Sequence, residues 1–500
     1  MRHIRILSAI TCLLSTVSCS APNDDGVMNY TNPYVAVNIV NEAGSYYLSF
    51  LTVSNEPVML RSTLKTNSHT VTGDAFGLQK DITFAVHTML LGSTYHIRPE
   101  MLETHLKYEV VSKSGAKQEH TIALPTKSDL NFAVVSGTAN TKSWKDLAVA
   151  VKMADLLIVT GGRIALSHTD PNLRCLLTNK SITEKEKAMI PRVFLESYLA
   201  PLASPEAREV LATKPTIHAG IDWRDVFEEF FVYATCKPDQ KPPALDEISG
   251  TALTFYRIFC LHDLSAPRPI SPTHTLLPFS LSCVQHFPNF VLINFDTVTH
   301  ADNPNMLHVI SNAIKSNLEN QKRTYQKKTL LIISSSPLAI ICNKLIQSIK
   351  DTHVQQQDLI RRSEFLSPNL LLRDFMNFIF ELQNYRFKQL LLVPPNAFGN
   401  ILSKITTQKS SFTIVHAGCF RESQQTFRIL GKFVVQEQNT SEKPISDATT
   451  TEEPISDATL PPCSIEFSYP GDDSNSFLMH QNGRTQMVQI KEGKQSSYKI

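Results

Sequence analysis

The chain has 500 residues, which is too long for one ordinary domain and suggests about three. Hydrophobic residues make up 42% and charged residues 19% of the chain, a composition that suits a folded protein with a sizeable core and excludes wholesale disorder. The 48 basic and 46 acidic side chains give a formal net charge of +2, so the composition predicts no nucleic-acid partner.

The N-terminus has the three-part order of a secretory signal peptide. Arg2 and Arg5 form a basic start, and Ile6 to Val17 is an apolar or small stretch without charge, followed by small residues. The apolar stretch is too short to span a bilayer, which needs about 20 residues. We therefore expect residues 1–18 to be a signal peptide that directs export. The alternative is an intracellular protein whose apolar N-terminus is fortuitous.

The segment Thr16-Val17-Ser18-Cys19 resembles the lipobox of bacterial lipoproteins. It departs from that family at Thr16, where the family prefers Leu. The resemblance implies a lipid on Cys19, which would then be the first residue of the mature chain. Such a lipid holds a protein at a membrane surface without spanning the membrane. Cleavage near Cys19 without lipidation, which would give a secreted protein, is the alternative.

The first half of the mature chain predicts strands and then helices. The mostly polar residues 19–33 predict a linker, and residues 34–130 a β-rich domain, because short runs of Val, Tyr, Phe and Leu alternate with turn formers. Residues 131–265 predict an α/β to helical region. It begins with a strand–helix–strand unit: a strand at Asn131 to Val135, a helical period at Ser143 to Ala154, and a buried strand at Leu156 to Val159.

A second α/β region is predicted over residues 280–435, where short apolar strands alternate with helices. This alternation is typical of a mainly parallel sheet that is covered on both faces. The strands are expected at Phe290 to Phe295, Thr329 to Ile333, Gln389 to Val393 and Phe412 to Val415, and Ala397 to Ile405 is expected to be a short helix.

The end of the chain is different in composition. Residues 436–462 contain the sequence Pro-Ile-Ser-Asp-Ala-Thr twice, 10 residues apart, among Ser, Thr, Glu and Pro, which predicts a disordered low-complexity linker. Residues 463–500 are expected to form a tail or a small hairpin. The predicted fold class is therefore mixed α/β, with a β-rich N-terminal part, a helical middle and a C-terminal α/β domain with a mainly parallel sheet.

The familiar motifs of enzymes are missing from the sequence, which leaves the activity and any cofactor unknown. The chain contains no GxGxxG, GxxxxGK[ST], HExxH or GxSxG pattern. In open parallel sheets, ligands bind at the carboxyl ends of the strands, so the residues that follow each predicted strand are the candidate sites.

Two of these strand ends predict anion binding. Gly161-Gly162-Arg163 can form a nest of backbone N–H groups for an anion, and the alternative is a two-glycine turn with a solvated Arg163. Ser334, Ser335 and Ser336 can offer hydroxyl and N–H groups to an anion at the start of a helix. The alternative for these serines is an N-terminal helix cap.

Two other strand ends predict metal binding or nucleophilic chemistry. Asp296, His300 and Asp302 carry ligand types that suit divalent metals, although Asp302 also suits a helix cap. A second set comprises His416, Cys419 and Arg421, where His or Arg would stabilise a Cys419 thiolate that acts as a nucleophile. This set loosely resembles the loop of cysteine-dependent phosphatases. That family places Cys and Arg six residues apart, and here they are two apart, so the loop cannot wrap a phosphate. A buried structural thiol is the alternative.

The expected function is that of an exported, lipid-anchored surface protein that acts as a binding or interaction module. Its partners would be the membrane surface, through the lipid on Cys19, and a protein or small ligand that the sequence does not identify. An extracytoplasmic hydrolase with a strand-end crevice around Asp296, His300 and Cys419 is the alternative. Removal of residues 1–18 would leave 46 basic and 46 acidic side chains, so the mature chain would be formally neutral.

Overall fold

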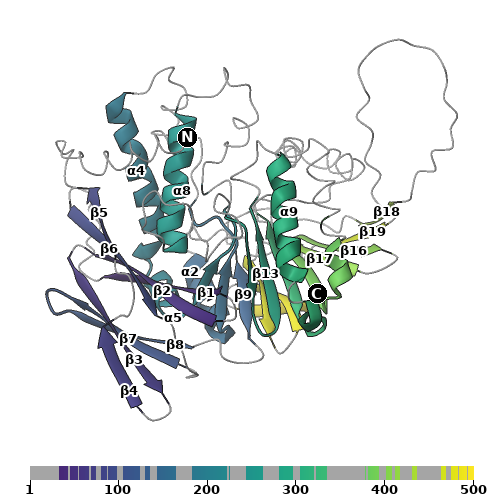
Figure 1. Ribbon diagram of the computed structural model, residues 1–500, viewed down its shortest axis with the longest axis horizontal. Coiled ribbons are helices and arrows are strands. Elements are labelled where there is room, and N and C mark those ends of the chain that lie inside the picture. The colour runs from purple at the N-terminus through teal and green to yellow at the C-terminus, as the bar shows by residue number, and fades with distance from the viewer. Residues whose placement is uncertain are drawn as a thin grey trace.

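The computed structural model has mixed α/β content, as the sequence predicts, and contains sheets with both parallel and antiparallel strands (Figure 1). The residues that the structure describes are 33–42, 45–54, 56–66, 69–74, 80–86, 88–97, 105–123, 130–135, 143–164, 183–221, 225, 244–262, 281–296, 304–319, 322–334, 378, 381–393, 401–407, 411–416, 431–435, 463–468, 475–481, 484–491 and 494–499.

The first sheet is 10-stranded and has the order β22-β21-β20-β9-β10-β11-β1-β2-β6-β5. Its four central strands, β9, β10, β11 and β1, run parallel, and the strands outside them pair antiparallel. The bounds are β1 Tyr34–Glu42, β2 Ser45–Ser54, β5 Lys80–Val86, β6 Thr88–Ile97, β9 Phe132–Val135, β10 Leu156–Val159, β11 Thr216–His218, β20 Asn475–Gln481, β21 Arg484–Lys491 and β22 Lys494–Lys499.

The second sheet is 8-stranded and has the order β12-β13-β14-β15-β17-β16-β19-β18. Strands β13, β14, β15 and β17 run parallel, and β12, β16, β19 and β18 pair antiparallel. The bounds are β12 Cys283–His286, β13 Phe290–Phe295, β14 Thr329–Ser334, β15 Gln389–Val393, β16 Ile401–Thr407, β17 Ser411–His416, β18 Gly431–Val435 and β19 Cys463–Ser468.

The helix expected at Ala397 to Ile405 is wrong, because β16 occupies most of this segment. β16 begins at Ile401 and pairs antiparallel with both β17 and β19. Its β-branched Ile and Thr side chains favour an extended strand, and the two neighbouring strands satisfy its backbone groups.

The third sheet is 4-stranded and antiparallel, with the order β4-β3-β7-β8. Its strands are β3 Val58–Thr66, β4 His69–Asp74, β7 His105–Ser112 and β8 Lys117–Ala123.

Helices cover one face of the first sheet. The alternating side chains Ala36, Ala133, Leu157 and Val159 share a buried core with these helices. The α-helices of the described part of the chain are α2 Ser143–Ala150, α4 Glu184–Leu199, α5 Pro205–Thr213, α8 Leu245–Leu261 and α9 Pro304–Glu319, of which α9 lies in the second α/β region.

The opposite face of the first sheet packs on the other sheets. Val37, Phe132 and Ile158 point to this side and share one core with Phe290 and Leu331 of the second sheet. The rings of Phe132 and Phe290 lie 4.5 Å apart between centroids. The two parallel sets of strands are therefore in direct contact through their buried side chains.

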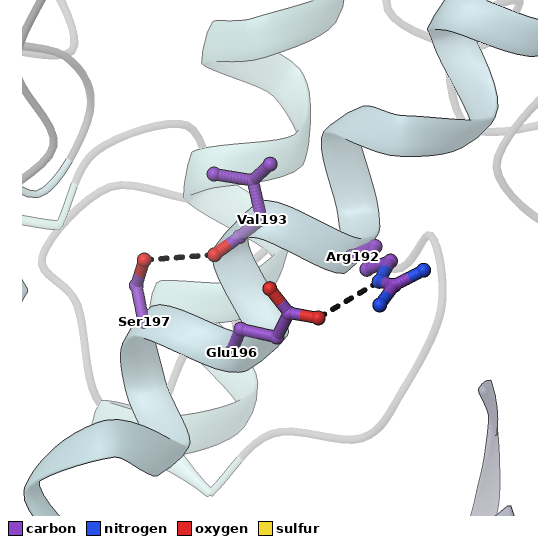
Figure 2. A network of polar contacts seen from close by, with 4 residues as sticks. All are labelled: Arg192, Val193, Glu196 and Ser197. Atoms are coloured by element: carbon purple, nitrogen blue, oxygen red, sulfur yellow. Dashed lines mark hydrogen bonds and ion pairs between the residues drawn. The ribbon is translucent and has the colours of Figure 1, made fainter. Parts of the chain in front are cut away.

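Helices α4 and α8 lie side by side (Figure 1). The rings of Tyr198 on α4 and Phe259 on α8 stack with their centroids 4.9 Å apart. Figure 2 shows two polar contacts within α4. Arg192 Nε donates to Glu196 Oε1 at 2.8 Å, and Ser197 Oγ donates to the Val193 carbonyl at 2.7 Å. Arg192 and Glu196 are exposed, and such an exposed pair adds little to stability.

Helix α5 depends on a side-chain cap that can be tested. Ser204 Oγ accepts a hydrogen bond from the Ala207 N–H at 3.3 Å, and Pro205 occupies the first helical position. We expect Ser204→Ala to lower the free energy of unfolding by about 1 kcal/mol, because this N–H loses its partner. Urea unfolding measures the loss. Ser204→Asp retains an acceptor at the same position and should keep most of the stability.

Candidate functional site

The loop after β10 is held by an internal carboxylate. Gly161 and Gly162 have φ angles of 86° and 66°, which glycine adopts without steric cost. Asp225, which is fully buried, accepts hydrogen bonds from the N–H of Gly162 at 2.9 Å and from the N–H of Ile164 at 3.1 Å. Two of the N–H groups near the predicted anion nest are thus bonded to the protein's own Asp225.

Arg163 of the same loop is buried, with 2% of its surface exposed. Its guanidinium carbon lies 5.5 Å from the centroid of the Trp144 ring, and its guanidinium hydrogen-bonds the Tyr34 hydroxyl. Burial raises the pKa of Tyr34 to about 12, while Arg163 acts in the opposite direction. Nη1 of Arg163 has no hydrogen-bond partner among the described residues.

A small cavity lies where β11 and β1 meet, next to the carboxyl end of β11. These two strands have one register pair, Asn38 with Thr216. We call this space the junction cavity. It has a volume of about 30 Å³, and its lining comes from β1, β11, α8 and the start of the second sheet: Asn38, Ile39, Thr216, Ile217, His218, Tyr256, Cys260, Leu261, Leu281, Cys283, Gln285 and Asn294.

Three amide side chains of the junction cavity have oxygen atoms that lack a donor. Asn38 Oδ1, Gln285 Oε1 and Asn294 Oδ1 are buried and have no hydrogen-bond partner in the part of the chain that the structure describes. The amide nitrogens of the two asparagines are anchored. Asn38 Nδ2 donates to the Cys260 carbonyl at 2.5 Å, and Asn294 Nδ2 donates to the Leu281 carbonyl at 2.7 Å. A flip of either amide would break these bonds, so the oxygens stay where they are.

Two free thiols line the same cavity. Burial raises the pKa of the Cys260 thiol far above its usual range and that of the Cys283 thiol to about 11. Both are therefore thiols at neutral pH and not thiolates. Because the thiolate is the reactive form, the environment of these two residues does not favour nucleophilic catalysis.

His218 is buried at the end of β11 and also lines the cavity. Burial lowers its pKa well below the usual range, and the charges of Arg163 and His262 lower it further. The imidazole is neutral at neutral pH and retains one ring nitrogen as an acceptor.

The neutral His218 predicts a loss of stability in acid. Its folded-state pKa lies below the unfolded value of about 6.5, so the unfolded chain binds more protons in the window between the two values. Stability is full above about pH 6.5 and falls with decreasing pH by up to about 1.4 kcal/mol per pH unit for this group. Denaturant unfolding between pH 7.5 and 5 measures the slope.

We expect His218→Gln to reduce this slope, and the same change at the exposed His308 to leave it unaltered. Burial also lowers the pKa of His120 and of His286, so part of the slope should remain in the His218 variant. An unchanged slope in His218→Gln would contradict the assignment.

The other predicted site residues are only partly described. Asp296 follows β13 and is fully buried; its Oδ2 accepts from the Leu281 N–H at 3.1 Å, and its own N–H donates to Ser282 Oγ at 2.9 Å. Ser334 ends β14 and His416 ends β17. Residues outside the described part are Cys19, His300, Asp302, Ser335, Ser336, Cys419 and Arg421. Within the described part, no cluster of three or more His, Cys, Asp or Glu side chains could hold a metal ion.

The amides of the junction cavity were missed by the sequence argument, which considered only residues after the strands. Asn38 and Asn294 each lie inside a strand between two apolar residues, in the sequences Val-Asn-Ile and Ile-Asn-Phe. A polar residue inside a buried strand needs a partner, so these two asparagines were the available signal.

We compared the chain with protein-family models and with curated proteins, and neither comparison gives a match.

Proposed function

We propose that this protein is exported, is anchored to a membrane surface by a lipid on Cys19, and acts as a binding module. Its ligand would be a small polar solute, or the polar end of a larger molecule, that enters the junction cavity. The observation that supports this proposal best is that Asn38, Gln285 and Asn294, which line one cavity, each have a buried amide oxygen without a donor among the described residues.

Buried polar atoms without hydrogen-bond partners reduce the stability of the folded chain. A buried acceptor without a partner costs about 1–3 kcal/mol, so a ligand that donates hydrogen bonds to these oxygens recovers that cost on binding. The cavity also lies next to the carboxyl end of β11, between two strands of the parallel part of the sheet. Ligands of open α/β sheets bind in such crevices.

The anchoring part of the proposal depends on the sequence of residues 1–19. No helix of the described residues is long and apolar enough to cross a membrane. The proposed contact with the membrane is the lipid alone. Mass spectrometry of the mature N-terminus from the native host tests it: a diacylglyceryl mass on Cys19 supports the anchor, and an intact Met1 contradicts export.

We further propose the layout expected from the sequence, with a β-rich N-terminal part, a helical middle and a C-terminal α/β domain with a mainly parallel sheet. Four parallel strands in the second sheet support the last part of this layout.

The binding proposal can be tested although the identity of the ligand is open. The purified protein is examined by native mass spectrometry, and small molecules released on denaturation are identified. We expect a bound species in the unmodified protein and its loss in Asn294→Leu, which has a similar shape but no acceptor. Asn317→Leu is the matched control, because it makes the same change on α9, away from the cavity, and should retain the ligand. A bound species that is equally abundant in all three proteins would contradict the site.

A further inference from the structure

Two basic segments lie next to each other at the start of the second sheet. Residues 322–328 precede β14 and residues 383–388 precede β15, and together they contain six basic residues and no acidic residue. The two segments are joined directly, because the N–H of Lys388 donates to the carbonyl of Lys328 at 3.0 Å. We call the two segments together the basic edge.

Three basic residues of the basic edge are exposed: Lys327, Arg386 and Lys388. Lys328 is half-buried, and its Nζ donates to the carbonyl of Phe287 at 2.8 Å. Lys327 and Arg386 make no ion pair with an acidic side chain in the described part of the chain. Their charges are therefore available to an anionic partner in solution.

Aromatic rings hold the turn that carries Arg386. The ring of Tyr325 stacks on that of Phe387 at 4.5 Å between centroids and meets that of Tyr385 edge-on at 6.2 Å. Arg386 lies between these two partners with a φ angle of 57°, in the left-handed region that residues other than glycine rarely adopt. Phe387 stays partly exposed, so the basic edge presents an apolar ring among its cations.

The acidic side chains nearby do not cancel this charge. Burial and then the charge of Glu319 raise the pKa of Tyr325 to about 12, so this carboxylate acts on the edge, and Glu381 pairs with Lys315 at 2.7 Å. Against these two acids stand five basic side chains, those of Lys315, Lys327, Lys328, Arg386 and Lys388. The local excess is three positive charges, on a mature chain that is formally neutral. Such an excess attracts anions over about 10 Å at moderate salt.

The basic edge is continuous with the edge at which the chain enters the first sheet. Asn289 accepts from the Thr329 N–H at 3.0 Å, and its Nδ2 donates at 2.9 Å to the carbonyl of Leu130, just before β9. Strand β1 belongs to the same parallel set as β9 and begins at this end, at Tyr34. Cys19 is 15 residues earlier, a reach of about 50 Å at most.

We propose that the basic edge binds anionic lipid headgroups of the membrane to which Cys19 is anchored. Lys327, Arg386 and Lys388 meet the phosphates, and the ring of Phe387 lies at the level of the headgroups, where aromatic side chains are favoured. The proposed function has the lipid as its membrane contact, and this inference goes beyond it by adding a second, electrostatic contact.

The test is vesicle binding by the mature chain, residues 19–500, with Cys19→Ser to remove the lipid. The protein is sedimented with vesicles of phosphatidylcholine alone or with added phosphatidylglycerol. We expect binding to the anionic vesicles only, and its loss as the salt concentration rises. Changing Lys327, Arg386 and Lys388 together to Gln should weaken binding about 100-fold, because each basic side chain at an anionic surface contributes about fivefold.

A matched control keeps the change in net charge the same. Lys107, Lys113 and Lys117 are exposed on the third sheet or the turn within it, and changing all three to Gln should leave binding unaltered. Near-UV circular dichroism checks the fold of both variants. If the first variant does not fold, Lys327→Gln with Lys388→Gln leaves Arg386 in place and should weaken binding about 30-fold.

Three results would overturn the membrane contact. These are no binding to anionic vesicles at low salt, an equal loss in the two triple variants, or a loss of binding to double-stranded DNA alone in the basic-edge variant, which would identify a nucleic-acid site. None of them bears on the lipid of Cys19 or on the junction cavity, because the test protein has no lipid and both triple variants retain the cavity. The proposed function would then stand with the lipid as its membrane contact.

Discussion

Asp225→Ala should lower the free energy of unfolding by about 4 kcal/mol. The side chain is fully buried and accepts hydrogen bonds from the N–H groups of Gly162 and Ile164. Its removal leaves both N–H groups without this partner, at about 1–3 kcal/mol each, and it also removes a negative charge from the surroundings of Arg163. Urea unfolding, monitored by far-UV circular dichroism, measures the loss.

Two variants sharpen this prediction. Asp225→Asn keeps one oxygen acceptor and should cost less than Asp225→Ala. Asp246→Ala removes an exposed carboxylate from the first turn of α8 and should cost less than about 1 kcal/mol. If Asp225→Ala were as stable as Asp246→Ala, the carboxylate would not hold the loop after β10, and the account of the strand-end region would be wrong.

The second large effect is expected at the contact between the two sheets. Phe290 is fully buried, and its ring lies 4.5 Å from that of Phe132 and 4.4 Å from that of Phe287. We expect Phe290→Ala to cost about 3–5 kcal/mol, because the lost burial and the remaining cavity both destabilise the folded state. Denaturant unfolding measures the change.

A double-mutant cycle isolates the contact between the sheets. Phe132→Ala and Phe290→Ala should couple by about 1 kcal/mol, since each removes the same ring pair. Val309→Ala is the control, because Val309 is 42% exposed on α9 and should cost little. Strictly additive losses in the two phenylalanine variants would mean that these rings do not meet, and that the two sheets do not pack in this way.

The local elements could be predicted because each has a strong pattern in a short stretch of sequence. β10, β13 and β15 begin and end at the predicted residues, since each is a short, mostly apolar run with turn-forming or polar residues after it. β16 was assigned wrongly because the Ala397 to Ile405 stretch is short and apolar positions alone do not separate a helix from a strand. The conformation of β16 depends on its pairing with β17 and β19, and this pairing cannot be inferred from the sequence of the segment alone.

The site could not be predicted from local patterns because its residues come together only in the folded chain. Asn38 belongs to β1, Gln285 to β12 and Asn294 to β13, and the lining also includes Cys260 of α8. The pairing of β20 with β9 could not be predicted for the same reason, because these two strands are far apart in the sequence and meet only in the folded chain. The sequence of Gly161 and Gly162 predicts a loop that can bind an anion. In the structure the Asp225 carboxylate accepts hydrogen bonds from N–H groups of this loop.

The most direct test of the account is a crystal structure of the mature protein, purified from its native host, at a resolution that separates waters from other species. We predict one non-water species in the junction cavity, within about 3 Å of Asn38 Oδ1, Gln285 Oε1 and Asn294 Oδ1. A cavity that holds only water, or amide oxygens that are bonded to donors of the protein itself, would contradict the claim that this cavity is the binding site.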